Sequence, residues 1–142
     1  MNCYTQFSVL VAEQLSAEER AWIKVQEAER ESFWATGFDE DPELQQFWAD
    51  LEGVEFEATE NDEFVISSEE GGSPDAAAAL VTEFLADHRP QELVVIEWAN
   101  TASKLRPGNH GGGIAVISAK ETAWFDSAKW AEETAARLRT TL

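Results

Sequence analysis

Two strongly apolar runs separated by a polar loop set the tightest constraint on how this chain can fold. Residues 93–98 read LVVIEW, residues 114–117 read IAVI, and the loop between them ends in three consecutive glycines. Short apolar runs that are rich in β-branched residues and bounded by turn residues are typical of buried strands. We therefore expect these two strands at the centre of a β-sheet.

Helix-start signals divide the rest of the chain into regular elements. Ser16–Glu19 form a capping box, in which the serine oxygen accepts from a backbone amide and the glutamate reaches back. Asp41 followed by Pro42 predicts an N-cap and the first helical residue of a second helix. Ser73 opens a third helix in the same way, and Asp126 or Ser127 caps a fourth.

The alternation of these helices with short apolar runs predicts the fold class. The expected elements in chain order are strand 4–12, helix 16–33, a helix from 41 that ends at Gly53, strands 54–58 and 64–67, helix 73–87, strands 93–98 and 114–117, a short apolar segment around Trp124 and a C-terminal helix. The first six major elements follow the split β-α-β order of ferredoxin-like folds. We predict a single acidic α+β domain over residues 1–142. Its ferredoxin-like core has four to five mostly antiparallel strands with helices on one face, and it carries an appended strand and a C-terminal helix.

The composition indicates a folded protein rather than a disordered one. Forty-four per cent of the residues are apolar, and six Trp and eight Phe can fill a core. Cys3 is the single cysteine, which excludes a disulfide framework and favours a reducing compartment. The N-terminus lacks the basic region of a signal peptide, and the longest apolar runs are too short to cross a bilayer. We expect a cytoplasmic protein that binds neither a membrane nor a cofactor.

The net charge of −18 is unevenly distributed along the chain. Residues 13–70 carry 19 acids and 3 bases, whereas residues 101–142 carry 4 acids and 6 bases. A field of this sign repels phosphate, so direct nucleic-acid binding is disfavoured. An acidic surface can instead occupy the basic groove of a protein that handles nucleic acid, because duplex DNA presents about one negative charge per 1.7 Å of its axis.

The first half of the chain therefore supplies the candidate partner-binding face. Glu55 and Glu57 are expected about 7 Å apart on one side of a strand, near the spacing of successive phosphates. The carboxylates assigned to this acidic face are Glu27, Glu31, Asp39, Glu40, Asp41, Glu43, Glu55, Glu57, Glu60, Asp62 and Glu63. Glu69 and Glu70 precede the third helix and are interpreted as partners of its dipole.

A second candidate site lies in the central stretch. Glu97 stands within an apolar strand, where burial would raise its pKa or require a cationic partner; the alternative is an exposed glutamate near a strand end. The glycine loop could present amides to an anion; the alternative is a mobile turn or a close backbone approach. The members of this alternative ligand or anion site are Glu97, Ser103, Lys104, Arg106, His110, Gly111, Gly112 and Gly113.

Known catalytic and metal-binding templates find no match in the sequence. HGGG at residues 110–113 occurs in lipases, but no G-x-S-x-G nucleophile elbow accompanies it, and no Walker A pattern is present. The two histidines lie 22 positions apart and lack a zinc-binding spacing. The acidic run at residues 39–43 would need glycine where Leu44 stands to form an EF-hand loop. We assign no catalytic and no metal-binding residue.

The pattern EWA…SK-x-R…GGG within residues 92–118 resembles small uncharacterised proteins of bacteria and their phages. That resemblance implies no activity. In size and charge, and in these alone, the chain is also similar to the small acidic inhibitors with which phages block restriction or CRISPR systems, and no site residues are carried over from them.

Three functional hypotheses follow from these patterns. The first is a non-enzymatic acidic binding protein that mimics nucleic acid and inhibits a basic nucleic-acid-handling protein. The second is a small enzyme or anion-binding domain centred on residues 97–113. The third is an ordinary domain with the acidic surface typical of halophiles, because only four lysines accompany the 28 acids.

Overall fold

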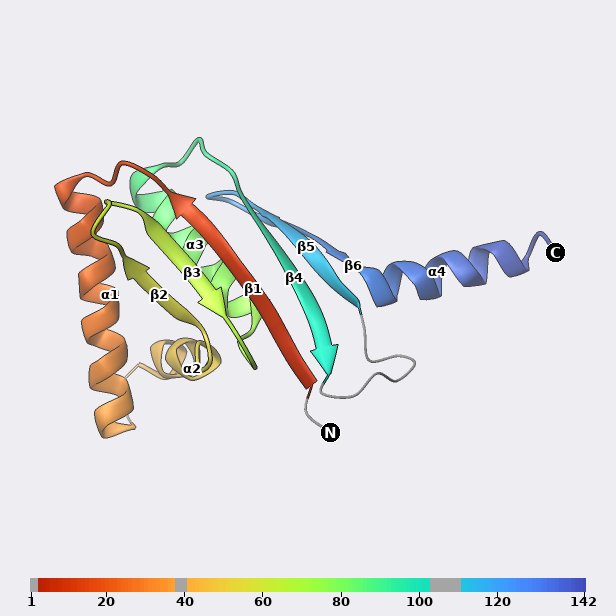
Figure 1. Cartoon of the computed structure of the whole chain (residues 1–142), viewed down its shortest axis with the longest axis horizontal. Helices are drawn as coiled ribbons and strands as arrows, with labels where there is room; N and C mark the ends of the chain where they lie inside the picture. The colour runs from red at the N-terminus through yellow and green to blue at the C-terminus, as the bar shows by residue number, and fades with distance from the viewer. Residues whose placement is uncertain (1–2, 38–40, 103–110) are drawn as a thin grey trace.

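The computed structural model describes residues 3–37, 41–102 and 111–142, which form an α+β structure with a six-stranded sheet and four helices. The elements are β1 (Cys3–Ala12), α1 (Ala17–Thr36), α2 (Pro42–Asp50), β2 (Glu55–Ala58), β3 (Phe64–Ser68), α3 (Pro74–His88), β4 (Val94–Ala102), β5 (Gly111–Ile117), β6 (Thr122–Asp126) and α4 (Ser127–Arg139). Figure 1 shows α1 along one end of the sheet and α4 projecting from the other.

The sheet has the order β2-β3-β1-β4-β5-β6, and every pair of neighbouring strands is antiparallel. β1 joins the two halves, because its first residues pair with β4 and its last residues pair with β3. The predicted central pair is confirmed as neighbours, with Val94 opposite Ile117. The expectation of four to five strands was too low, because the segment around Trp124 pairs with β5 as a full strand.

The predicted helix starts are confirmed by their hydrogen bonds. Ser16 Oγ accepts from the Glu19 amide at 3.1 Å, and Glu19 Oε1 accepts from the Ser16 amide at 2.8 Å. Asp41 caps α2, Ser73 caps α3 and Asp126 caps α4. These local contacts satisfy the amides that a helix N-terminus leaves without a partner, which is why the sequence alone locates them.

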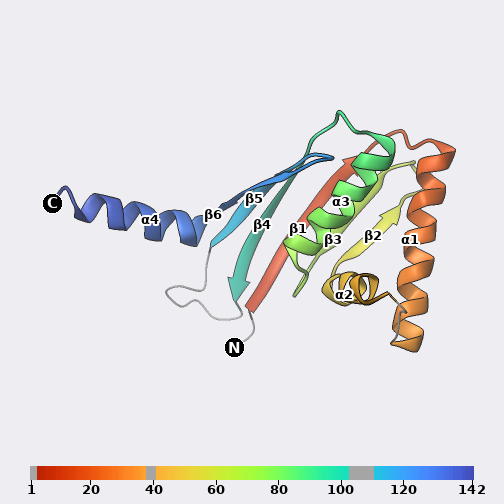
Figure 2. The same cartoon turned by 180° about the vertical axis from the view of Figure 1, so that it is seen from behind.

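The core lies between one face of the sheet and the helices α1 to α3. Because side chains alternate along the strands, Phe7, Ile66 and Ile96 point into this core. Phe84 of α3 and Ile23 of α1 belong to the same cluster of buried residues. In Figure 2, α3 crosses the sheet and α1 runs beside β2. The predicted placement of these three helices on one face is therefore correct.

The opposite face of the sheet has no helix over it among the described residues. Val95, Ile114, Val116 and Phe125 remain exposed there, each alternating with a residue that faces the core or the helix side. α4 leaves the end of β6 and extends away from the sheet, and none of its residues is buried (Figure 1). In the described part of the chain, no helix has the length and apolar character needed to span a membrane.

Candidate functional site: an acidic cleft

The carboxylates that the sequence assigned to one face are spread over several elements. Glu55 and Glu57 are both exposed on β2 with buried Phe56 between them, as the alternation predicted. Glu27 of α1 lies near Glu57. Burial is the largest cause that raises the pKa of Glu27, and the negative charges of Glu57 and Glu31 raise this pKa further. The acids of α1 and β2 therefore share one electrostatic environment.

The remaining predicted acids lie apart from that group. Asp41 and Glu43 stand at the start of α2, where each carboxylate is close to the positive end of the helix dipole. Glu60, Asp62 and Glu63 form the turn between β2 and β3. Asp62 pairs with Arg20 at 3.0 Å, so this carboxylate has a structural partner. Asp39 and Glu40 lie outside the described residues.

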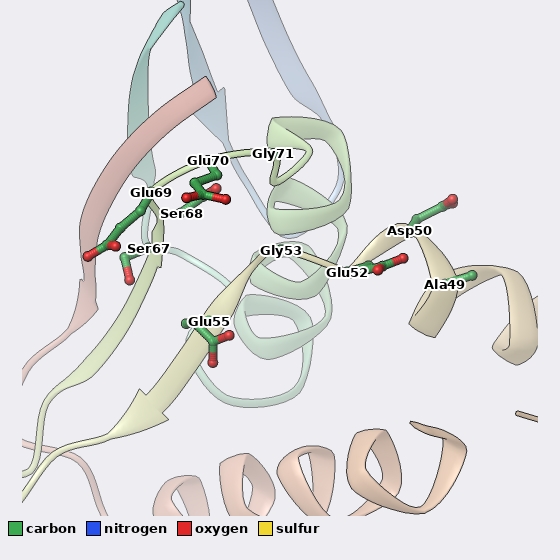
Figure 3. Close-up of a pocket in the computed structure, with 10 residues that line it drawn as sticks. All are labelled: Ala49, Asp50, Glu52, Gly53, Glu55, Ser67, Ser68, Glu69, Glu70 and Gly71. Carbon is green, nitrogen blue, oxygen red and sulfur yellow. The ribbon is translucent and has the colours of Figure 1, made fainter. Parts of the chain in front are cut away.

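A group of carboxylates lines an open cleft of about 680 Å³ at one end of the sheet. Its five acids come from the end of α2, the start of β2 and the segment after β3; they are Asp50, Glu52, Glu55, Glu69 and Glu70. Figure 3 shows Glu69 and Glu70 on one side of the cleft, with Asp50 and Glu52 across from them. We name this set the acidic cleft.

Two glycine segments in close approach build the acidic cleft. Gly53 has a φ of +86°, and a β-carbon added there would meet the Gly72 amide nitrogen at 3.1 Å. Gly72 is equally confined, because its added β-carbon would lie 2.5 Å from Ser68 Oγ. The absence of side chains lets the loop after α2 touch the loop after β3. The acids next to each glycine are thereby brought to the same opening.

Ser68 fixes the loop that carries Glu69 and Glu70. Its buried hydroxyl accepts from the Gly72 amide at 2.8 Å and donates to the Thr5 carbonyl at 3.3 Å. The Glu70 carbonyl in turn accepts from the Thr5 amide at 2.6 Å. Both acids are therefore held on an ordered backbone while their side chains remain exposed.

Among the described residues, Arg30 of α1 is the base that pairs with an acid of the acidic cleft. Its Nη2 lies 3.5 Å from Glu55 Oε2, and among the described residues Glu55 is the only acid of the cleft with an ion pair. Arg30 itself is 6% exposed, and its Nη1 donates to the Val54 carbonyl at 2.5 Å. The guanidinium lies 4.3 Å from the ring centre of Phe56 and 4.6 Å from that of Trp34. It is therefore part of the protein interior, and the carboxylates face solvent with little compensation.

The spacing of these acids favours an extended cation over a single metal ion. No three of the carboxylate, imidazole or thiol groups in the described residues converge closely enough to bind one ion. Carboxylates distributed around an open cleft instead match several guanidinium or ammonium groups on another chain.

The alternative site in the central stretch is not assembled in the described residues. Glu97 is exposed on the open face opposite Ile114, so the exposed alternative holds and the buried one does not. Gly111, Gly112 and Gly113 belong to β5 and pair with Asn100, Ala99 and Trp98, so they are strand residues rather than a loop. Ser103, Lys104, Arg106 and His110 lie outside the described residues.

The glycines of β5 have a packing role. A β-carbon on Gly113 would overlap the Trp98 ring and the Phe125 carbonyl, and one on Gly112 would overlap the Trp98 carbonyl. Gly111 has a φ of +127°, a conformation that side chains rarely adopt. Of the alternatives drawn from the sequence, the close approach of neighbouring atoms to the glycine backbone therefore explains the three glycines.

Sequence reasoning did not assign Asp50, Glu69 or Glu70 to a site. Glu69 and Glu70 were interpreted as dipole partners of the third helix, yet they line the acidic cleft. The one sequence signal for this cleft was a glycine directly after the acids, Gly53 after Glu52 and Gly71 after Glu70. Comparisons of this chain with protein-family models, with curated proteins and with solved structures gave no match.

Proposed function

We propose that this protein is a non-enzymatic binding protein whose acidic cleft engages a basic protein partner. The observation that carries this proposal is the cleft itself, in which five carboxylates surround one opening and a single buried arginine approaches one of them. Complementary charge speeds association and excludes wrong partners, and desolvated charge pairs across an interface can add affinity.

The partner class that we propose is a protein that handles nucleic acid. Such proteins carry basic grooves shaped for rows of phosphates. Glu55 and Glu57 of β2 extend the acidic cleft along a regular strand, and Glu27 adds charge beside them. A partner that docks here would have its nucleic-acid site occupied, which would make this protein an inhibitor.

We also propose that the first four strands form a ferredoxin-like core. The observation in favour is the order β2-β3-β1-β4, in which β1 and β2 flank β3 and all neighbours are antiparallel. The core would then hold the acidic cleft at one end, and β5, β6 and α4 would be additions at the other.

A capture experiment with a competition step tests the proposed function. The immobilised protein is incubated with lysate at 50 mM salt, and each captured protein is purified and bound to labelled duplex DNA. We expect a partner whose DNA is displaced by the wild-type protein, with the displacement lost at several hundred millimolar salt. The variant Glu55→Lys/Glu57→Lys should not displace the DNA while its circular dichroism spectrum stays unchanged. Displacement by this variant as strong as by wild type would refute the proposal.

A further inference from the structure

In the part of the chain that the structure describes, one edge of the sheet is covered and the other edge is open. α1 runs beside β2 at the covered edge. Two arginines of α1 donate hydrogen bonds to carbonyls at the two ends of β2: Arg30 to Val54 and Arg20 to Thr59. β6 ends the strand order at the opposite side, with the sequence TAWFD. This segment has neither the lysine nor the proline that commonly protects an edge strand. A free antiparallel edge is able to pair with an identical copy of itself.

α4 follows this open edge and lacks a packing surface of its own. Its 13 residues include none that is buried, and Trp130 and Leu138 are 55% and 48% exposed. Isolated helices of this length are marginal in water, and most helices in proteins are stabilised by packing an apolar face. The described part of the chain offers no such packing surface to the far half of α4.

The apolar face that could receive α4 lies on the uncovered side of the same sheet. Register places Val95 opposite Val116, and Ile114 opposite Phe125, so these side chains form one apolar patch across three strands. The exposed carboxylate of Glu97 stands beside this patch, opposite Ile114. The patch reaches α4 directly, because the rings of Phe125 and Trp130 lie 6.4 Å apart.

The size of this surface matches what a dimer requires. Interfaces take about 800 Å² from each partner, of which about 60% is apolar, or roughly 500 Å². The exposed parts of the six apolar side chains add up to an area on the order of 500 Å². The six residues are Val95, Ile114, Val116, Phe125, Trp130 and Leu138.

The charge distribution is compatible with a second copy of this chain as the partner. Most of the surface would repel an identical copy, since the net charge is −18. Residues 119–142, which contain β6 and α4, carry four acids and four bases and are therefore neutral. This is the part of the molecule where two copies can meet without a large electrostatic cost.

We propose that the protein forms a twofold-symmetric dimer in which the two β6 edges adjoin. In this dimer α4 of each copy crosses the apolar patch of the other. Figure 1 shows α4 extending beyond β6 and away from the sheet of its own chain, as this exchange requires. A twofold interface is self-complementary, so one helix and one patch per copy satisfy both sides. The acidic clefts would then lie at the two outer ends, free to bind partners.

The molar mass of the full chain in solution tests the dimer. Light scattering at about 50 µM protein in 0.5 M salt, which screens repulsion beyond a few ångströms, should give twice the chain mass of 15.8 kDa. Val116→Glu and Leu138→Glu should each give a monomer, because each places a charge in the buried surface. Val25→Glu, which changes an exposed apolar residue on α1, should remain a dimer.

Hydrogen exchange provides a second readout that does not depend on a variant that folds. The amides of α4 in the wild-type protein should be protected at high concentration and lose that protection on dilution. A wild-type protein that is monomeric at 50 µM would overturn the proposal. It would also be overturned if Val116→Glu and Leu138→Glu both remained dimeric. Exchange in α4 that is independent of concentration would overturn it as well. None of these results depends on the acidic cleft, so the proposed function is judged separately.

Discussion

Arg89 closes α3 onto the first turn of α1 through a two-point contact with Glu19. Arg89 Nε donates to Glu19 Oε2 at 2.7 Å, and Nη2 donates to Oε1 at 3.2 Å. The same carboxylate accepts from the Ser16 amide, so one side chain both caps α1 and binds α3. The hydrogen bond from Arg89 is the main cause that lowers the pKa of Glu19 from 4.5 to about 2, against a smaller opposing effect of burial.

Glu19→Gln should remove the charge of this contact while it keeps the capping hydrogen bond, because glutamine also serves in a capping box. At pH 7 we expect the free energy of unfolding to fall by about 1–3 kcal/mol, as for a hydrogen bond to a charged group. The folded-state pKa lies below the unfolded value, so the contribution is complete above about 4.5 and is lost as the pH falls toward 2.

Urea unfolding of both proteins at a series of pH values measures this loss. The difference between wild type and Glu19→Gln should shrink between pH 4.5 and pH 2. Because every other carboxylate is common to both proteins, the difference isolates Glu19. A difference that stays constant down to pH 2 would contradict the role assigned to the Arg89 contact.

Arg30→Lys should destabilise the protein although the charge is kept. Lysine cannot reproduce the planar contact with the rings of Trp34 and Phe56 while it also donates to the Val54 carbonyl. We expect a loss of about 1–3 kcal/mol in the free energy of unfolding. Arg20→Lys is the control, since Arg20 is more exposed and pairs with Asp62 at the surface. A cost for Arg20→Lys equal to that for Arg30→Lys would show that the ring contacts contribute little.

Gly113→Ala should destabilise the fold because its methyl group would overlap the Trp98 ring and the Phe125 carbonyl. Forcing a group into a packed site costs about 1–3 kcal/mol. Gly71→Ala is the matched control, since a β-carbon there meets no atom within 4 Å. Thermal melts of the two variants measure the contrast, and equal melting temperatures would exclude the packing role of the β5 glycines.

Removing charge from the acidic cleft should make the free protein more stable. Like charges around one opening repel, so Glu52→Gln should raise the melting temperature by about 1–3 °C at low salt. The increase should vanish in 0.5 M salt, where the repulsion is screened. Glu132→Gln on α4, next to no comparable cluster, should change the melting temperature less. A Glu52→Gln protein that melts at or below the wild-type temperature would indicate that the cleft acids are already compensated.

Features that depend on local contacts could be predicted from the sequence, and features that depend on long-range contacts could not. The caps at Ser16, Asp41 and Ser73 are decided within one helical turn, and each is found where the pattern placed it. β6 was expected only as a short apolar segment, because its five residues become a strand only through pairing with β5. β5 itself is longer than expected, since its glycines allow Trp98 to pack against the backbone.

The candidate site depended on contacts that no local pattern records. The acidic cleft exists because Gly53 and Gly72 touch, although 19 positions separate them in the chain. The burial of Arg30 follows from the position of α1 beside β2, and an isolated helix pattern gives it no special status. The sequence left both burial and exposure open for Glu97, because it interrupts an apolar run, and the open face of the sheet leaves it in solvent.

We propose that the acidic cleft, and not the overall charge, binds a basic partner. The most direct test of this binding is the affinity for a fluorescent nine-arginine peptide, measured by anisotropy at 50 mM salt. The cleft variant Glu52→Lys/Glu69→Lys is compared with Glu132→Lys/Glu133→Lys on α4, which changes the net charge by the same amount. We expect the cleft variant to weaken binding by about tenfold or more, and the α4 variant by about threefold or less. Equal losses in the two variants would contradict binding in the acidic cleft, because the peptide would then respond to net charge alone.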